Sequence, residues 1–226
     1  MRTKPTLLLI ILLLSAFLSS AQSSGPGNMS FGVLAGVNFS NINGKEYNGE
    51  KTNNEMLVGF HAGVNVQIPI VPEFYFQPGL LFSTKGAKSK AQLLFGTNYK
   101  ATTTLNYLEV PLNFVYKGAL GGGYVMIGLG PYFAFGISGK MKDNYGTINV
   151  KFKNTIELGD DESIPYVKRF DAGANIFAGY QMAGGLFFQF NTQLGLLKIN
   201  PEDKYLTDDK TSYKNTGFGL SLGYRF

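Results

Sequence analysis

The chain has 226 residues, no Cys and 19 Phe, and only 15% of its residues are charged, against roughly 25% in soluble domains. The lack of Cys excludes a disulfide framework and any thiolate metal site or nucleophile. Two of the 20 Lys and Arg residues, Arg2 and Lys4, lie in the N-terminal segment discussed next; the remainder exceeds the 15 acidic residues by about +3. This excess is too small to predict a nucleic-acid partner.

The first 21 residues have the features of a secretory signal peptide. Arg2 and Lys4 form a basic start, residues 7–14 (LLLIILLL) an apolar centre, and small residues lead up to Ala21. The alternative, a membrane anchor, is disfavoured because the apolar run is too short to span a bilayer comfortably. We predict cleavage after Ala21, export from the cytoplasm, and one mature domain over residues 22–226.

Eight segments of the mature chain alternate apolar with small or polar residues, which is typical of β-strands with two different faces. In VGFHAGVNVQI, for example, every second residue from Val58 to Ile68 is apolar, and the chain's single His, His61, lies on the other face. The predicted strands are residues 31–40, 58–68, 74–85, 102–117, 124–138, 170–181, 186–197 and 215–226.

The connections between these segments alternate in length. Residues 69–73, 118–123 and 183–185 are short connections that contain Pro or Gly, as turns do. The long and polar connections are residues 41–56, 86–101, 139–169 and 198–214. We therefore predict an up-and-down sheet with three short turns at one end and four long loops at the other.

Charged side chains are nearly absent from the predicted strands. Only Glu109, Asp171 and Arg225 lie inside them, all on the polar face. Glu73 and Lys117 border short turns, and we assign Lys85 and Arg169 to the edges of long connections. The charge-free face is therefore either a buried core or a lipid contact. The alternative with an apolar core, a secreted soluble barrel, would leave Gly- and Gln-rich faces in water.

The strand length decides between these alternatives. Eleven residues at about 3.3 Å each, tilted by about 45°, span roughly 25 Å, the height of the apolar band of an outer-membrane barrel. Because backbone groups in lipid must be paired internally, such a sheet has to close. We predict an all-β fold: an eight-stranded antiparallel up-and-down transmembrane β-barrel with three short periplasmic turns and four long extracellular loops.

Short motifs spread over nearly the whole mature chain resemble the PorT-like outer-membrane β-barrel family. They are FGVLAGVNFS at 31–40, GFHAG at 59–63, QPGLLFS at 77–83 followed by KGAK at 85–88, YLEVPL at 107–112, GLGPY at 128–132 and SLGYRF at 221–226. The resemblance implies the outer membrane of Gram-negative bacteria. The family's name-giving member belongs to a protein secretion and gliding machinery, whereas most relatives have no assigned role.

The C-terminal residues Tyr224 and Phe226 have a second interpretation. A terminal aromatic residue matches the pattern by which the barrel-assembly machinery recognises outer-membrane strands. Both residues also fit outward-facing aromatic side chains at the membrane interface. The two roles are compatible, and we predict both.

The lumen of an eight-stranded barrel is just wide enough to be filled by side chains. We expect a polar plug, with an open pore or a slow gate as the alternatives. Counting from the turn at 118–123 places Glu109 opposite Tyr132, so we expect Glu109 to accept a hydrogen bond from Tyr132 or another inward neighbour. We expect Arg225 to find a carboxylate or backbone carbonyls near the short-turn end. The predicted network consists of His61, Gln77, Glu109, Tyr132, Asp171 and Arg225.

An enzymatic role would have to use His61, because it is the only candidate base for a nucleophilic triad. No G-x-S-x-G motif is present, and no Ser is tied to His61 by sequence spacing. One His without Cys also disfavours a zinc site. Carboxylates at 160–162 and 208–209 leave Ca²⁺ binding open, although neither run has the spacing of a known Ca²⁺ loop.

We therefore predict no catalytic residue, no cofactor and no assigned metal site. The predicted role is structural, or surface recognition through the long loops. The alternatives are a subunit of a protein secretion machinery and, less favoured, a lipid-acting enzyme. The expected partners are outer-membrane lipids, the barrel-assembly machinery and, for the first alternative, secretion-system proteins.

Overall fold

The computed structural model of the chain describes residues 28–92 and 98–226, so the predicted signal peptide at 1–21 lies outside the described residues. The described residues form strands joined by turns and loops. These strands are β1 (Ser30–Lys45), β2 (Asn54–Val71), β3 (Phe74–Gln92), β4 (Asn98–Leu120), β5 (Gly123–Lys142), β6 (Thr147–Asn149), β7 (Lys151–Phe152), β8 (Thr155–Ile156), β9 (Tyr166–Val167), β10 (Phe170–Met182), β11 (Leu186–Gly195), β12 (Glu202–Asp203) and β13 (Ser212–Arg225).

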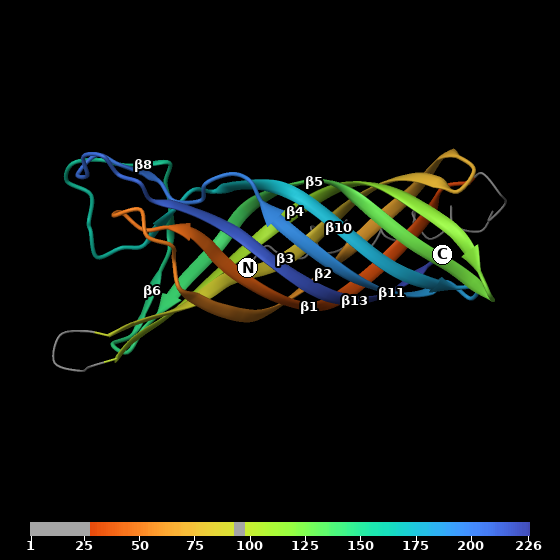
Figure 1. The fold of residues 1–226 in the computed structure, drawn as a ribbon, viewed down its shortest axis with the longest axis horizontal. Helices are drawn as coiled ribbons and strands as arrows, with labels where there is room; N and C mark the ends of the chain where they lie inside the picture. Colours follow the sequence, from red (N-terminus) through yellow and green to blue (C-terminus); the bar gives the residue numbers. More distant parts are fainter. Residues whose placement is uncertain (1–27, 93–97) are drawn as a thin grey trace, which may run out of the picture.

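Eight long strands close into a ring. Their order is β1-β2-β3-β4-β5-β10-β11-β13, and β13 pairs with β1 to complete the barrel, each neighbour being antiparallel. Figure 1 shows the tilted strands side by side, with the C-terminus and the short turns at one end and the long loops at the other. Nowhere in 28–92 or 98–226 is there a helix both long and apolar enough to cross a membrane. The predicted eight-stranded up-and-down barrel is confirmed.

The strands extend further at the long-loop end than predicted. The β3–β4 ladder continues from Lys85 opposite Leu105 to Gln92 opposite Asn98, so most of the predicted loop at 86–101 is a two-stranded ribbon. The hydrophobic alternation marks only the part of each strand that needs an apolar face, whereas backbone pairing continues above it. The connection at 139–169 also contains β6 to β9, and β12 pairs with β8 in parallel.

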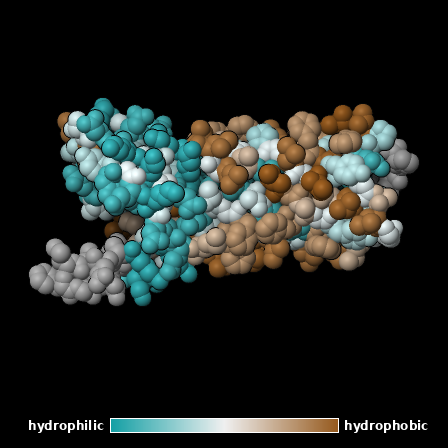
Figure 2. Space-filling view, viewed as in Figure 1, coloured by the Kyte–Doolittle hydropathy of each residue, from teal (hydrophilic) through white to brown (hydrophobic). Residues whose placement is uncertain are grey.

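The outward parity carries the apolar side chains. Val64 on β2 is 44% exposed and Leu220 on β13 is 54% exposed. Figure 2 shows apolar residues over the barrel wall and hydrophilic residues gathered over the long-loop end. Because the described ladders close the ring, no strand edge of the barrel is left unpaired, as a lipid environment requires.

Glycines on the inward parity make room for larger lumen side chains. A Cβ at Gly128 would lie 2.2 Å from the Phe177 ring, and one at Gly36 would lie 2.6 Å from the His61 ring. Both contacts are shorter than any real Cβ tolerates, so the rings occupy the space that a side chain would need. Phe177 and His61 therefore fit inside the barrel because Gly stands at these two positions.

The tight turn between β4 and β5 sets a register different from the predicted one. The strands end at Leu120 and resume at Gly123, so the connection is shorter than the predicted turn at 118–123. From the turn to Tyr107, each pairing therefore shifts by two residues, and Glu109 lies opposite Ala134 rather than opposite Tyr132. Since a shift of two keeps the side-chain parity, Glu109 still faces the lumen.

Candidate functional site

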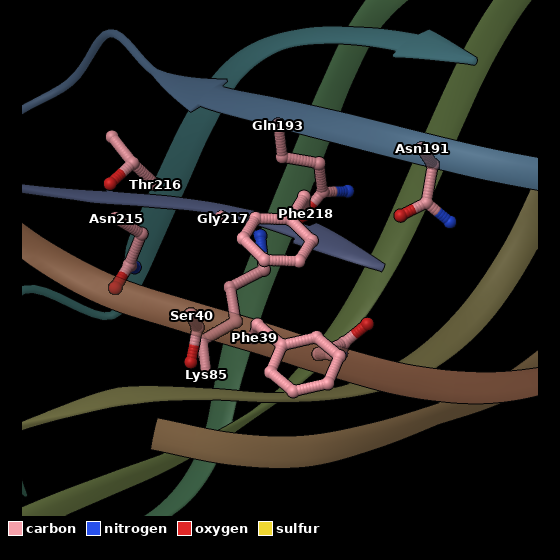
Figure 3. Close-up of a pocket in the computed structure, with 10 residues that line it drawn as sticks. Phe39, Ser40, Lys85, Asn191, Gln193, Asn215, Thr216, Gly217 and Phe218 are labelled. Carbon is pink, nitrogen blue, oxygen red and sulfur yellow. The ribbon is translucent and has the colours of Figure 1, made fainter. Parts of the chain in front are cut away.

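A cluster of three buried charges lies across the lumen. The Lys85 Nζ is 2.8 Å from Glu109 Oε2 and 3.6 Å from Asp171 Oδ2. Glu109 and Asp171 lie in one row of the sheet on either side of Ala134, which pairs with both. Figure 3 shows Lys85 with side chains from β1, β11 and β13 around it. Glu109 and Asp171 are fully buried, and Lys85 is 4% exposed.

The inward position of Lys85 corrects its assignment to the edge of a long loop. Because β3 continues to Gln92, Lys85 keeps the inward parity of Gln77 and Ser83. That shared parity is the sequence signal that would have identified it. The ammonium also lies 4.1 Å from the centre of the Tyr132 ring, in cation–π contact.

Hydrogen bonds also hold the two carboxylates, although the buried Asp171 Oδ1 has no hydrogen-bond partner among the described residues. Gln193 Nε2 donates to Glu109 Oε1. Asp171 Oδ2 accepts from Asn215 Nδ2 at 3.0 Å and from the Tyr132 hydroxyl at 3.4 Å. We predicted that Tyr132 or another inward neighbour would donate to Glu109. The donor is the inward Gln193, whereas the Tyr132 hydroxyl donates to Asp171.

Arg225 lies near the short-turn end, apart from this cluster. Its Nη2 donates to Asn65 Oδ1 at 2.7 Å and to Gln77 Oε1 at 3.3 Å. Gln67 Nε2 also donates to Gln77 Oε1, at 2.8 Å. The main acceptors are therefore side-chain amides, which sequence reasoning did not name, and the carbonyl of Ser30 is 3.5 Å from Nη1.

His61 is held between Asn38 and Ser221. Its Nδ1 is 2.6 Å from Asn38 Oδ1, and its Nε2 is 2.7 Å from Ser221 Oγ. This arrangement fits an Nδ1–H that donates to the amide and an Nε2 that accepts from the hydroxyl. His61 and Ser221 flank Gly36 in one row of β2, β1 and β13.

The contact between His61 and Ser221 is one that sequence spacing does not reveal. The two residues are 160 positions apart in the sequence, and only barrel closure between β1 and β13 brings them together. The geometry is that of a nucleophile, a base and an orienting group. However, His61 and Ser221 are both buried in the lumen wall.

The lumen filling contains apolar layers beside the polar groups of the predicted plug. One buried cluster consists of Leu34, Val115, Met126, Phe177 and Phe187, and a second of Leu105, Tyr107, Tyr132, Ala134, Val150 and Ile199. Two cavities between the polar groups measure about 20 and 40 Å³. Spaces of this size hold one to a few water molecules, so these two cavities do not form a passage.

A larger cavity of about 300 Å³ lies among the loops. It is adjacent to the second cluster, because Val150 and Ile199 belong to both. We call the loops around it, residues 143–169 and 196–211, the loop cap. The other residues that line the cavity are Ile42, Glu46, Asn54, Ala87, Ser89, Thr103, Ile156, Pro165, Tyr166, Val167, Asn200, Pro201, Asp203, Leu206, Asp209, Thr211 and Tyr213.

Carboxylates lie at the rim of this cavity. The Tyr213 hydroxyl donates to Glu46 Oε2 at 2.6 Å, and burial together with this carboxylate raises the pKa of Tyr213. The tyrosine therefore stays protonated and remains a donor at any physiological pH. Asp203 and Asp209 each accept a backbone N–H within the loop cap, which fixes the position of both carboxylates.

The acidic run at 160–162 is partly occupied by internal contacts. Asp160 accepts from Lys153 Nζ and from the Glu157 amide, and Asp161 accepts from Ser163. The Lys153 hydrogen bond is the main cause of the lowered pKa of Asp160. Within 28–92 and 98–226, no group of three or more His, Asp or Glu residues is arranged to hold a metal ion.

Tyr224 and Phe226 lie at the outer surface near the C-terminal end of β13. Their rings make an edge-to-face contact with centres 4.9 Å apart, and each is more than 40% exposed. The Phe226 amide donates to the Phe31 carbonyl at 2.8 Å. This contact ties the C-terminus to the first strand of the ring.

The chain was compared with known proteins. The family model described as outer membrane protein beta-barrel domain matches residues 20–200. Comparison with curated proteins gave no match. Similar solved structures include Ail, the attachment invasion locus protein of Yersinia pestis (12% identity, TM-score 0.38, covering 87% of this chain and 98% of that one). A second is Ail in complex with the heparin analogue sucrose octasulfate (13% identity, TM-score 0.40, covering 88% of this chain and 99% of that one). Similarity this low supports no argument about function.

Proposed function

The chain belongs to the outer membrane protein beta-barrel domain family, and from this premise we propose that it is a closed barrel that recognises a ligand with its loop cap. The family places the protein in the outer membrane. The observation that carries the proposal is the 300 Å³ cavity formed by ordered loops, which is as large as the smaller ligand pockets of proteins.

The orientation follows from the two ends of the barrel. Outer-membrane barrels have short periplasmic turns and long extracellular loops, so the loop cap faces the outside of the cell and both chain ends face the periplasm. Export by a signal peptide cleaved after Ala21 is part of this proposal. The cavity is then open to molecules at the cell surface.

The chemistry of the cavity favours an apolar ligand with a cationic group. Its floor is apolar, with Val150 and Ile199 buried. Its rim carries the carboxylates of Glu46, Asp203 and Asp209 and no Lys or Arg. An aromatic or alkyl amine, or the side chain of a basic peptide residue, satisfies both parts: its apolar body lies on the floor and its ammonium lies among the carboxylates.

The filled lumen supports recognition rather than transport. A permeating ion would have to displace the buried cluster of Lys85, Glu109 and Asp171, and breaking such a pair is costly. The second buried cluster, which contains Leu105, lies between these three charges and the loop cavity. We therefore propose a barrel without conductance.

An enzymatic function is not favoured, although Ser221, His61 and Asn38 have the contacts of a catalytic triad. The nearest cavity that touches His61 and Asn38 measures about 40 Å³, which holds water but no lipid ester. We propose that these residues stabilise the lumen. PorT-like membership and a place in a secretion machinery remain predictions, because no contact in the described residues favours them.

The proposed recognition is tested by calorimetry on the barrel in phosphocholine nanodiscs. Tryptamine is expected to bind, whereas indole-3-propionate, which has a carboxylate instead of the amine, is not. The double substitution Asp203→Asn with Asp209→Asn should abolish tryptamine binding, whereas Glu162→Gln, an exposed acid outside the cavity, should leave it unchanged. Equal binding of the two indoles, or none by either, would rule out this ligand chemistry.

A further inference from the structure

Five lysines line one open cleft at the long-loop end of β1 and β13. The cleft measures about 610 Å³, and no acidic residue lines it. Its lining consists of Lys45, Lys51, Lys198, Lys210 and Lys214 with Asn43, Gly44, Thr52 and Ser212. Within 28–92 and 98–226, none of these five lysines makes an ion pair.

The lysines face the outside of the barrel, opposite to the loop cavity. Lys214 has the same parity as the exposed Leu220 and Leu222 on β13, and Lys45 has that of the exposed Val33 and Val37 on β1. Two acids adjacent to the lysines in sequence, Glu46 and Asp209, line the loop cavity instead, as does Tyr213. Successive side chains of a strand point to opposite faces. The lysines therefore line the outer cleft, and the carboxylates line the loop cavity.

The cleft lies just above the apolar band. The uppermost aromatic pair on these strands is Phe39 with Phe218, whose rings stack with centres 5.1 Å apart. The pair of Asn43 with Lys214 lies four residues beyond the pair of Phe39 with Phe218, toward the long loops. Four residues at about 3.3 Å each, in strands tilted by about 45°, place Lys214 roughly 9 Å above the aromatic pair. That height is at the outer edge of the headgroup layer, which adds about 5–8 Å to each side of the hydrocarbon core, and a long Lys side chain reaches back into this layer.

The five charges repel one another in the isolated protein. Lys45 and Lys51 are paired directly across an antiparallel bridge, an arrangement in which like charges destabilise a sheet. No ion pair neutralises them among the described residues, and the adjacent carboxylates of Glu46 and Asp209 line the loop cavity instead. A bound anion with several charges relieves this repulsion, and lysine is a common phosphate ligand.

We propose that this cleft binds a multiply phosphorylated headgroup. Its position on the outward face, at the outer edge of the headgroup layer, identifies the source as an outer-leaflet glycolipid with two or more phosphates, the chemistry of lipid A, rather than a soluble polyanion. One phosphate carries at most two negative charges, so five lysines match a headgroup with at least two phosphates. This site is independent of the loop cavity and of its proposed ligand.

The test compares lipid binding by native mass spectrometry of the barrel in nanodiscs. The nanodiscs consist of phosphatidylcholine with a few per cent of diphosphoryl lipid A, monophosphoryl lipid A or neither. Lys45→Gln with Lys214→Gln should weaken retention of diphosphoryl lipid A about thirtyfold, since a lysine near a membrane surface contributes about 1 kcal/mol. Lys140→Gln with Lys142→Gln, which removes the same charge outside the cleft, should change it less than twofold.

A second arm separates the two sources of phosphate. Inorganic pyrophosphate and a sulfated oligosaccharide are added at the same charge concentration, and neither is expected to displace the lipid. Equal retention by the two double variants, or equal retention of the two lipids, overturns the proposal. Full displacement by the soluble anions overturns the assignment to a lipid. Tryptamine binding is measured in the same samples, so that failure of the loop cavity is detected separately.

Discussion

Replacing Lys85 by Met tests whether the lumen is held together by its buried charges. The Lys85 side chain is 5% exposed, and those of Glu109 and Asp171 are 1% and 0% exposed. Met is unbranched and fills nearly the same space, so the substitution removes the cation without a large cavity. Two carboxylates on either side of Ala134 would then face each other without a counter-ion.

The expected loss of stability follows from this burial. Removing one partner of a buried pair costs about 3–5 kcal/mol, because it leaves an uncompensated charge. The hydrogen bonds from Gln193 to Glu109 and from Asn215 to Asp171 remain and offset only part of the loss. The triple variant Lys85→Met, Glu109→Gln, Asp171→Asn carries no charge in the cluster, so we expect it to recover most of the stability.

The assay is urea titration of the barrel in lipid vesicles, followed by the heat-modifiable shift on gels. The control is Lys90→Met, which breaks an exposed pair with Glu55, and exposed pairs contribute about 0–1 kcal/mol. A Lys85→Met variant no less stable than this control would refute the buried cluster. So would a triple variant less stable than the single one.

Two further predictions concern the membrane. Val64→Lys on the lipid face should cost about 2–4 kcal/mol near the bilayer midplane. Gln193→Lys, which faces the carboxylates in the lumen, should cost less in the same titration, and equal costs would invert the assignment of faces. The inward Asn65 next to Val64 is not used as the control, because its amide oxygen accepts a hydrogen bond from Arg225 and a Lys there would also remove that bond. Protease added to intact cells should cut within 143–169 and spare the turn at 121–122; cleavage at that turn would reverse the proposed topology.

The eight strands and their two faces could be predicted from the sequence, because these features are local. Residues two apart share a face in any strand, so the apolar parity from Val58 to Ile68 was visible without the fold. The inward positions of Glu109, Asp171 and Arg225 followed in the same way. The length of each strand ladder could not be predicted from the sequence, because strand pairing above the apolar band requires no hydrophobic alternation. For that reason the hydrophobic pattern does not show that Lys85 faces the lumen.

The lumen contacts were decided by the tertiary structure. Ser221 meets His61 because β13 and β2 both pair with β1, and Gly36 leaves the space between them. The register of β4 with β5 depends on a tight turn, and for this reason Glu109 pairs with Ala134 instead of the predicted Tyr132. The cleft of five lysines combines β1 and β13, the two ends of the sequence. Parity is a property of each strand alone, whereas register and closure depend on how distant strands pair, and these decide which inward side chains meet.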